Sequence, residues 1–363
     1  MLKIGIITCG KEPNYGACLQ AFATQSLIQE LGYDVDIMNY SFIADKSYSP
    51  FVQPSIKSAI IAVFFFFSRR EQWKSFAKFR KKYMSYSDKR LFTAEDFKDI
   101  KNKYDIFVTG SDQVWNPELG IDLSITLQSF IAPSDNIRQI SYASSFGVKS
   151  LNLEQFKRFK TALSGFDALS VREPSGAKIV NECIGHDCCK VVCDPVMLYD
   201  VSFWMKIMDH SRTPKTKYVV IYDMRHSKDV MDCALKIANT RHCKVIALSR
   251  IKMIRPGIKF VINLSPSQFL SLLYHSEAVV TDSFHGTVFS IIFHKEFYSF
   301  ISKEGERIGD RLLHILDMCH LNNRLYSGSE NIDFSPIDYS KVDPIVDSYR
   351  MSSRHFLKDS LDG

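Results

Sequence analysis

The stretch Ala278–Phe297, AVVTDSFHGTVFSIIFHKEF, joins two short apolar runs through a polar turn. The first run, 277–281, reads as a strand, and the second, 287–293, reads as the start of a helix. Asp282–Gly286 would then form the strand-to-helix turn. In open α/β sheets, ligands bind outside the carboxyl ends of strands, where such turns lie. The stretch therefore predicts an α/β fold with a ligand site at this turn.

The chemistry expected at this turn is anion binding. A helix N-terminus offers N–H groups and the positive end of the helix dipole, which favour a phosphate or a carboxylate. Gly286 lets the backbone bend or approach a ligand closely. His285 would project at the mouth of the crevice, where it could bind an anion or transfer a proton. A histidine that only caps the turn is the alternative, and the residues alone leave both readings open.

Strand-like and helix-like segments alternate along nearly the whole chain. The chain opens with a strand at 3–8, a helix at 17–31 closed by Gly32, and a strand at 34–40. Right-handed crossovers make the strands of such βαβ units parallel. Further strands are expected at 104–110, 138–146, 168–173, 190–194, 217–224, 243–249, 259–263 and 277–281, with helices at 227–239 and 265–276.

Two α/β domains account for this pattern and for the length of 363 residues. We predict an N-terminal Rossmann-like domain at 1–195, with a variable basic and aromatic segment at 51–90. A second Rossmann-like domain at 196–330 would carry the turn described above. Residues 331–363 are expected to form a C-terminal helical tail.

Composition and charge are those of a soluble globular protein, with 45% hydrophobic and 24% charged residues. The net charge of +6 suggests an anionic ligand or surface more than a nucleic-acid partner. The N-terminal MLKIGIITCG lacks the apolar region and cleavage site of a signal peptide. The longest apolar run, 59–67, is too short to span a bilayer. We therefore expect a cytoplasmic protein.

The nine cysteines are scattered and odd in number, which favours reduced thiols. The cluster CIGHDCCKVVC, 183–193, contains four cysteines and one histidine, which are possible metal ligands. Its spacing matches no paired Cys-x-x-Cys zinc pattern. Buried thiols are the favoured reading, and no metal site is predicted.

A strongly basic segment lies between residues 57 and 90, with ten basic residues against two acidic ones, a net charge of +8. It adjoins the apolar run AIIAVFFFF. Together these are the ingredients of a helix that lies on an anionic membrane, so peripheral association through 57–82 at the inner face of the membrane is one reading. A buried helix followed by a solvated basic helix is the favoured reading, because the apolar run is short.

Two further stretches carry candidate site residues. In DIFVTGSDQVWNP, 105–117, a strand ends at Gly110 and a loop rich in polar and aromatic groups follows, as expected for a lip that binds a hydroxyl-rich ligand. Asp112 could accept a proton from an alcohol there, or could cap a helix. In LSVREPSGAK, Arg172 ends an apolar run and either pairs with Glu173 or Asp194 or presents its guanidinium to an anion.

The ordered set of such motifs resembles the polysaccharide pyruvyl transferase family. The motifs are NYGACLQAFA, DIFVTGSDQVWNP, SYASSFG, LSVREPSG, CDPVML and VVTDSFHGTVFSIIF, and the later RLLHILDMCHLNNRL fits the same pattern. The resemblance runs from about residue 3 to residue 326. CDPVML departs from a more usual Asp-Pro-Thr, and neither 51–90 nor the tail carries a motif of the family.

The resemblance implies two domains that face a cleft, as in the GT-B glycosyltransferases. It also implies transfer of the enolpyruvyl unit of phosphoenolpyruvate to a sugar of an exopolysaccharide, capsule or cell-wall glycan precursor, which gives a pyruvate ketal and needs no cofactor. His285, Asp112 and Arg172 would be the catalytic residues. The expected substrate-binding residues are Asn14, Gly16, Ser111, Gln113, Trp115, Asn116, Asp282, Ser283, Phe284, Gly286, Thr287, Arg307 and Arg311.

Two rival functions remain at this point. A nucleotide-sugar glycosyltransferase would use the same architecture, and the turn DSFHG could bind a diphosphate. A non-catalytic glycan-binding protein is the rival from another class, and the joint presence of Asp112, Arg172 and His285 argues against it. The acceptor, lipid-linked or free, is not identified by the sequence.

Overall fold

The computed structural model describes residues 2–40, 56–223, 225, 227–249, 253–301, 310–326 and 332–363, and for 56–69 it describes the backbone alone. The chain forms two compact units. Among the described residues, unit 1 contains 2–40, 80–198 and 347–363, and unit 2 contains 56–79 and the parts of 199–346 that are described. The change from unit 1 to unit 2 after Leu198 lies close to the boundary expected at residue 195. The residues of the expected tail are divided between the two units.

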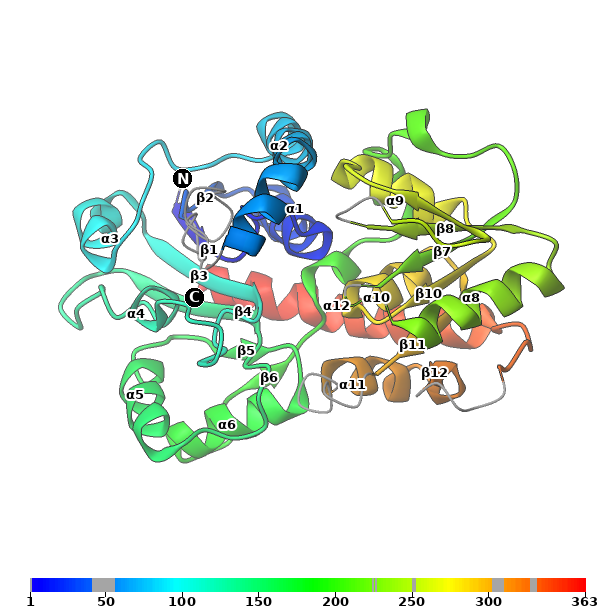
Figure 1. Ribbon diagram of the computed structural model, residues 1–363. Helices are drawn as coiled ribbons and strands as arrows, with labels where there is room; N and C mark the ends of the chain where they lie inside the picture. Colours follow the sequence, from blue (N-terminus) through cyan, green and yellow to red (C-terminus); the bar gives the residue numbers. More distant parts are fainter. Residues whose placement is uncertain are drawn as a thin grey trace. The chain divides into compact units, whose positions relative to one another are not determined.

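Unit 1 is built on a six-stranded parallel sheet with the order β2-β1-β3-β4-β5-β6 (Figure 1). Its first connection leads from β1 to β2 at one edge, and the remaining strands add on the other side of β1. The switch in direction therefore lies between β1 and β3. The strands are β1 (Lys3–Ile7), β2 (Asp34–Ile37), β3 (Ile106–Asp112), β4 (Arg138–Ser144), β5 (Ser170–Val171) and β6 (Lys190–Val191).

The ends of the first helix of unit 1, α1 (Tyr15–Glu30), are set by capping residues. The Asn14 side chain accepts the Ala17 N–H at the start, and Gly32 adopts a left-handed φ of 92° just beyond the end. The helix packs on β2 and β3. The other helices of this unit are α3 (Ala94–Ile100), α4 (Leu123–Thr126), α5 (Leu153–Leu163) and α6 (Pro174–Ile184), with 3₁₀ turns η2 (Lys101–Lys103) and η3 (Pro195–Leu198).

Unit 2 contains a second six-stranded parallel sheet, with the order β12-β11-β10-β7-β8-β9. This is the doubly wound order of a Rossmann fold, and its switch point lies between β7 and β10. The two sheets confirm the predicted fold class. The strands are β7 (Tyr218–Tyr222), β8 (Lys244–Leu248), β9 (Ile258–Val261), β10 (Ala278–Thr281), β11 (Glu296–Phe300) and β12 (Leu325–Tyr326).

The helices of unit 2 cover both faces of its sheet. α8 packs on β7, β8 and β10, whereas α10 packs on β10 and β11 and contacts α9 and α11. The bounds are α7 (Val201–Met205), η4 (His210–Arg212), α8 (Lys228–Thr240), α9 (Pro266–Tyr274), α10 (Phe284–Ile292), α11 (Asp310–Met318) and η6 (Asn322–Arg324).

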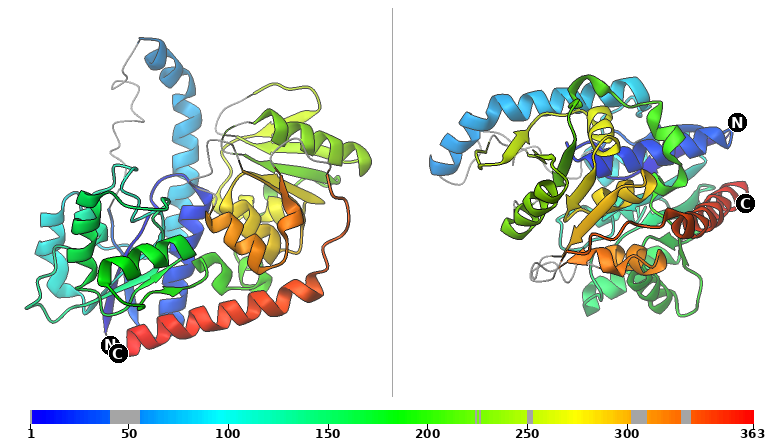
Figure 2. Two further views of the ribbon diagram at one scale, coloured as in Figure 1. Left: turned by 90° about the horizontal axis from the view of Figure 1, so that it is seen from below. Right: turned by 90° about the vertical axis from the view of Figure 1, so that its right-hand side faces the viewer.

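Two long helices complete the chain, α2 (Ile56–Tyr83) and α12 (Tyr339–Asp362), the latter drawn in red in Figure 2. Residues 56–83 of the basic segment thus form one continuous helix. The alternative of a buried helix followed by a separate basic helix is wrong. No helix within the described part of the chain is long and apolar enough to cross a membrane.

Candidate active site

The switch points of the two sheets are the places where this kind of fold binds ligands. In unit 1, β1 leads into Thr8 and Cys9, and β3 ends at Ser111 and Asp112. In unit 2, β7 leads into Asp223, and β10 leads into Asp282 and Ser283. Most of the predicted site residues that the structure describes lie at or next to these two switch points.

The turn after β10 is shorter than expected. α10 begins at Phe284, with Ser283 as N-cap, so His285 and Gly286 lie in the first helical turn and the strand-to-helix connection is Asp282 and Ser283 alone. The Gly286 N–H donates to Ser283 Oγ (3.5 Å) and the Thr287 N–H to the Ser283 carbonyl (3.1 Å). The amides expected to cradle a phosphate at Gly286 and Thr287 are thus engaged inside the helix.

Gly286 is required for packing. A Cβ atom at this position would lie 2.3 Å from Thr281 Oγ1 and 3.0 Å from Tyr222 Cδ1. The Thr281 hydroxyl itself donates to the Tyr222 carbonyl (2.6 Å) and accepts the Ser283 N–H (3.0 Å). The sequence predicted that the backbone at Gly286 would approach a ligand closely. In the structure it approaches Thr281 on β10 and Tyr222 on β7, so the start of α10 packs tightly on the sheet.

His285 lies at the start of α10 and is only 7% exposed. Its ring meets the ring of Phe284 edge-on, with centroids 5.3 Å apart. The Arg311 guanidinium, from α11, stands over the same Phe284 ring at 5.6 Å. A histidine and an arginine thus gather at the positive end of α10. Arg307, the other arginine expected here, lies outside the described residues.

Neighbouring loops of unit 2 are held by carboxylates. Asp223, buried at the end of β7, accepts the N–H groups of Arg225 (2.8 Å) and Ser227 (2.5 Å) and so shapes the start of α8. Asp282 is half-buried at the end of the neighbouring strand β10. The predicted residues Asp282, Ser283, Phe284, His285 and Arg311 therefore lie together at the switch point of unit 2.

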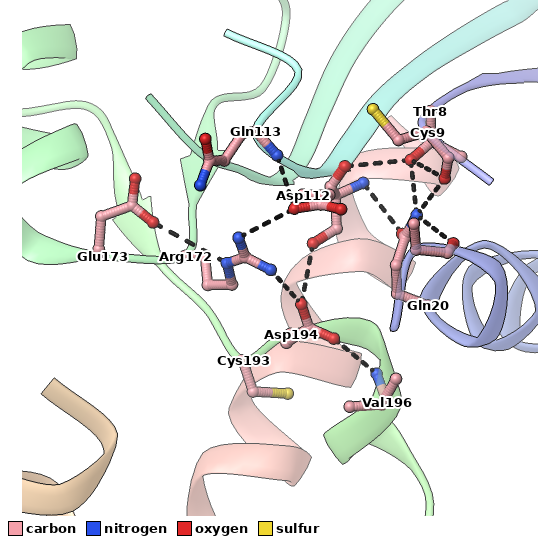
Figure 3. A network of polar contacts seen from close by, with 12 residues as sticks. Thr8, Cys9, Gln20, Asp112, Gln113, Arg172, Glu173, Cys193, Asp194 and Val196 are labelled. Carbon is pink, nitrogen blue, oxygen red and sulfur yellow. Dashed lines mark hydrogen bonds and ion pairs between the residues drawn. The ribbon is translucent and has the colours of Figure 1, made fainter. Parts of the chain in front are cut away.

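The switch point of unit 1 is filled by a buried charged network around Arg172 (Figure 3). Arg172 Nη1 lies 2.6 Å from Asp194 Oδ2, Nη2 lies 3.5 Å from Asp112 Oδ1, and Nε lies 3.9 Å from Glu173 Oε2. Burial alone would lower the pKa of Arg172, but Asp194 first, then Asp112 and Glu173, raise it above its usual range. The guanidinium stays charged among three carboxylates.

The three carboxylates differ in exposure, and this separates their roles. The side chains of Asp194 and Glu173 are 0% and 3% exposed, whereas that of Asp112 is 18% exposed. Asp194 Oδ1 accepts the Val196 N–H and Glu173 Oε1 accepts the Phe146 N–H. Asp112 is thus the most exposed carboxylate of this network. The nearby Cys9 thiol has its pKa raised well above the usual range by burial, then by Asp112 and Glu12.

The loop after β3 differs from the predicted binding lip. Trp115 is fully buried; its indole N–H donates to the Thr126 carbonyl (3.1 Å), and its ring packs against Phe146 and Phe159. Its place is in the core of unit 1. Asn116 is 5% exposed and donates to Gln113 Oε1 (2.7 Å), so these two side chains brace each other.

The predicted residues of the first strand-to-helix loop serve helix α1. Asn14 is its N-cap, and Gly16 is buried in its first turn. Ser111 is fully buried and donates from Oγ to Asp194 (3.2 Å). The structure therefore brings Ser111, Asp112 and Arg172 together, with Asn14 at the start of the helix on the same switch point.

Two residues of this network, Gln20 and Thr8, were not predicted. Gln20 is fully buried and donates to Thr8 Oγ1 (2.9 Å) and to the Cys9 carbonyl (2.6 Å). The signal that could have identified Gln20 is a glutamine between apolar residues of α1 such as Leu19 and Phe22, a signal that the buried Gln25 of the same helix shares.

The cysteine-rich segment contributes buried thiols. Burial raises the pKa of the Cys183 thiol to about 11 and that of Cys193 to about 12. Asn181 Oδ1 accepts the N–H groups of both Cys188 and Cys189. Within the described ranges, no group of three or more His, Cys, Asp or Glu residues is placed to hold a metal ion.

Solved structures share the fold of this chain. The UDP-GlcNAc 2-epimerase from Methanocaldococcus jannaschii matches with a TM-score of 0.53 and 12% identity over 95% of this chain and 92% of its own. The S. aureus MnaA–UDP structure matches with a TM-score of 0.54 and 10% identity over 98% and 90%. The Neisseria meningitidis UDP-GlcNAc 2-epimerase bound to UDP-GlcNAc matches with a TM-score of 0.53 and 9% identity over 99% of both chains.

These neighbours have the GT-B fold, and at such identity the likeness shows the fold alone. No curated protein matches the chain. The model of one family, polysaccharide pyruvyl transferase, matches residues 14–304, which include the ends of β3 and β10. The chain therefore belongs to the polysaccharide pyruvyl transferase family.

Proposed function

We propose that this protein transfers the enolpyruvyl unit of phosphoenolpyruvate to a sugar of a cell-surface glycan, where it forms a pyruvate ketal. The observation that carries the proposal is the site at the start of α10, where His285 and Arg311 gather at the positive end of a helix. Phosphoenolpyruvate carries a phosphate and a carboxylate, which helix ends and arginines bind. Membership of the family supports the same donor class.

The proposed reaction balances with the donor and two sugar hydroxyl groups. Carbon 3 of phosphoenolpyruvate takes up a proton while the first hydroxyl oxygen bonds to carbon 2 and loses its own proton. The second hydroxyl oxygen then displaces phosphate from carbon 2, and its proton leaves with the phosphate or a base. The chemistry requires an acid, a base and an anion site, and no cofactor.

Each role has a candidate residue. His285 would contact the donor and supply the proton to carbon 3, with Ser283 and Arg311 as further donor contacts. Asp112, the least buried carboxylate of the Arg172 network, would orient or deprotonate the acceptor hydroxyl. Arg172 is enclosed by Asp194, Glu173 and Asp112, so we assign it to hold Asp112 in place rather than to reach the donor.

Ligand-dependent stability tests the choice of donor. A ligand at about 100 times its dissociation constant should stabilise the protein by about 2.7 kcal/mol. We expect phosphoenolpyruvate to raise the melting temperature. A response to a uridine diphosphate sugar alone would replace the proposal by a nucleotide-sugar glycosyltransferase, which the UDP in the S. aureus MnaA structure makes the second candidate.

Turnover tests the reaction itself. The protein, phosphoenolpyruvate and a glycan acceptor should release inorganic phosphate in proportion to ketal formed. Phosphate release without ketal would show hydrolysis of the donor instead of transfer.

We also propose that the enzyme works in the cytoplasm at the inner face of the membrane, on acceptors that are lipid-linked. The described half of α2 carries exposed basic residues within an arc of about 120° at 100° per residue. The opposite face is buried. The basic residues are Arg70, Lys74, Lys78, Lys81 and Lys82, and the buried ones are Gln72, Phe76 and Phe79.

Vesicle binding tests this association. Replacing Lys74, Lys78 and Lys81 by glutamate should abolish binding to vesicles that contain anionic lipid, because each basic residue near such a surface contributes about 1 kcal/mol. The matched control replaces Lys157, Arg158 and Lys160, which are exposed on α5, by glutamate. Equal binding by both variants would refute the membrane contact through α2.

A further inference from the structure

Gln20 is a fully buried polar side chain at the switch point of unit 1. Its amide nitrogen donates to Thr8 Oγ1 (2.9 Å), to the Cys9 carbonyl (2.6 Å) and to the Ala17 carbonyl (2.9 Å). Its carboxamide oxygen accepts the Ser111 N–H (3.3 Å). One side chain from α1 therefore links the end of β1 to the end of β3.

Ser111 is fixed at each of its polar groups. Its N–H donates to Gln20, its carbonyl accepts the Thr8 hydroxyl (3.0 Å), and its own hydroxyl donates to Asp194 (3.2 Å). The Thr8 hydroxyl is itself a partner of Gln20. Gln20 thus holds Ser111 directly through the N–H and indirectly through the carbonyl.

The next residue, Asp112, has a left-handed backbone with φ of 69°. A non-glycine residue in such a conformation costs on the order of 1 kcal/mol, and it persists where the surroundings enforce it. The conformation turns the carboxylate so that Oδ1 accepts the Gln113 N–H (2.9 Å) and lies 3.5 Å from Arg172. The direction of the Asp112 carboxylate therefore depends on how firmly Ser111 is held.

We infer that Gln20 is a positioning residue for pyruvyl transfer, acting through Ser111 to fix the direction of the Asp112 carboxylate toward the acceptor hydroxyl. Gln20 is 0% exposed, so it acts through this link and not by touching substrate. The inference rests on the role proposed for Asp112.

Gln128 supplies a matched control. It too is fully buried, and its amide nitrogen donates to the Phe107 carbonyl (3.2 Å), to Thr109 Oγ1 (3.0 Å) and to the Ile140 carbonyl (3.3 Å). Phe107 and Thr109 lie on β3 before Ser111, and Ile140 lies on the neighbouring strand β4, opposite Val108. Replacing Gln128 by methionine removes three similar hydrogen bonds from the same sheet without releasing Ser111.

The test compares Gln20→Met with Gln128→Met in the full chain. Both variants should lose comparable stability, because each loses buried hydrogen bonds. Gln20→Met alone should lower kcat by about 10- to 100-fold with the KM for phosphoenolpyruvate unchanged, since small displacements of a reacting group have effects of this size. A wild-type kcat in Gln20→Met, or an equal fall in Gln128→Met, would overturn the inference.

Thr8→Val provides a second variant should Gln20→Met not fold. It removes the hydrogen bond to the Ser111 carbonyl and keeps the side-chain shape. A smaller fall in kcat in the same direction, again without a change in KM, is expected, and an unchanged kcat would count against the inference.

Amide hydrogen exchange separates this inference from the proposed function. If the wild type fails to turn over phosphoenolpyruvate, the proposed function fails, but exchange at Ser111 still reports on the link. Faster exchange at Ser111 in Gln20→Met than in Gln128→Met would support positioning by Gln20. Equal exchange in the two variants would refute it.

Discussion

Each of the two switch points lies beside the first strand of its sheet, and the two are built from different side chains. That of unit 1 encloses one guanidinium among three carboxylates, two of them essentially without exposed surface. That of unit 2 combines the carboxylates of Asp223 and Asp282 with hydroxyl groups, the first turn of α10 and the ring of His285, and Arg311 lies nearby. A shared fold thus sets where a site lies, and the side chains set what it does.

The difference matches two needs of the proposed reaction. A carboxylate that accepts a proton from a sugar must be held in one direction, and the buried network of unit 1 holds Asp112 in this way. An anionic donor requires cationic and hydrogen-bonding groups, and a helix end with a histidine and an arginine offers groups of this kind. Under the proposed function, this comparison supports acceptor binding by unit 1 and donor binding by unit 2, and each switch point can be tested separately.

The largest expected effect is on stability at the unit 1 switch point. Asp194→Ala leaves Arg172 without its nearest carboxylate, and breaking a buried ion pair from one side costs about 3–5 kcal/mol. Ser283→Ala at the unit 2 switch point removes a helix cap and should cost about 1 kcal/mol. Urea unfolding, followed by hydrogen exchange at β3 and β10, measures both losses.

Equal losses of stability in Asp194→Ala and Ser283→Ala would contradict the view that the unit 1 switch point depends more on buried charge than the unit 2 switch point does. Asp194→Asn provides a control for volume. It keeps the shape of the side chain and a hydrogen bond to Ser111 but removes the charge. Its free energy of unfolding should therefore lie between that of Asp194→Ala and that of the wild type.

A smaller effect is expected where α10 packs against the sheet. Gly286→Ala places a methyl group 2.3 Å from Thr281 Oγ1 and should destabilise unit 2 by about 1–3 kcal/mol. Gly176→Ala, in the first turn of α6 in unit 1, is the matched control, because its nearest atoms lie at 3.3 Å. Thermal unfolding of the two variants checks the difference, and a greater loss in Gly176→Ala would contradict it.

The smallest expected effect is a loss of stability of unit 2 in mild acid. Burial lowers the pKa of His314 in α11, and burial together with His210 and Lys295 lowers that of His275. Because both values are depressed on folding, the neutral rings contribute stability above the unfolded pKa of about 6.5, and this contribution is lost as the pH falls below it.

Hydrogen exchange at β10 should therefore become faster between pH 7.5 and pH 5.5, after correction for intrinsic exchange. His314→Gln should remove part of this change, with β3 of unit 1 as the internal reference. An identical pH response in His314→Gln and the wild type would show that this histidine does not carry the effect.

The fold could be predicted because buried parallel strands are continuous apolar runs. Segments such as 217–224 and 277–281 alternate with helical patterns, and connection rules then make the sheets parallel. The start of α10 was placed three residues too late. Ser283 caps the helix at once, and Gly286, which local propensity would put in a turn, is required inside the helix by contact with Thr281.

The candidate site was less predictable, because its contacts join distant parts of the chain. Trp115 follows a strand end, as a binding residue would, but the loop folds back so that its indole meets Thr126 in the core. Gln20 gives no local sign that its partner is Ser111, 91 residues away. For Arg172 the sequence left pairing and ligand binding open, and three surrounding carboxylates are visible only in the structure.

The most direct test of donor binding by unit 2 and acceptor binding by unit 1 is to measure donor affinity in His285→Ala and in Asp112→Asn. The dissociation constant for phosphoenolpyruvate, obtained by calorimetric titration, should rise at least about tenfold in His285→Ala, since a hydrogen bond to a charged group contributes about 1.5–3 kcal/mol. In Asp112→Asn it should stay within about twofold of the wild type while turnover is lost. A weaker donor affinity in Asp112→Asn than in His285→Ala would contradict the assignment of the donor to unit 2.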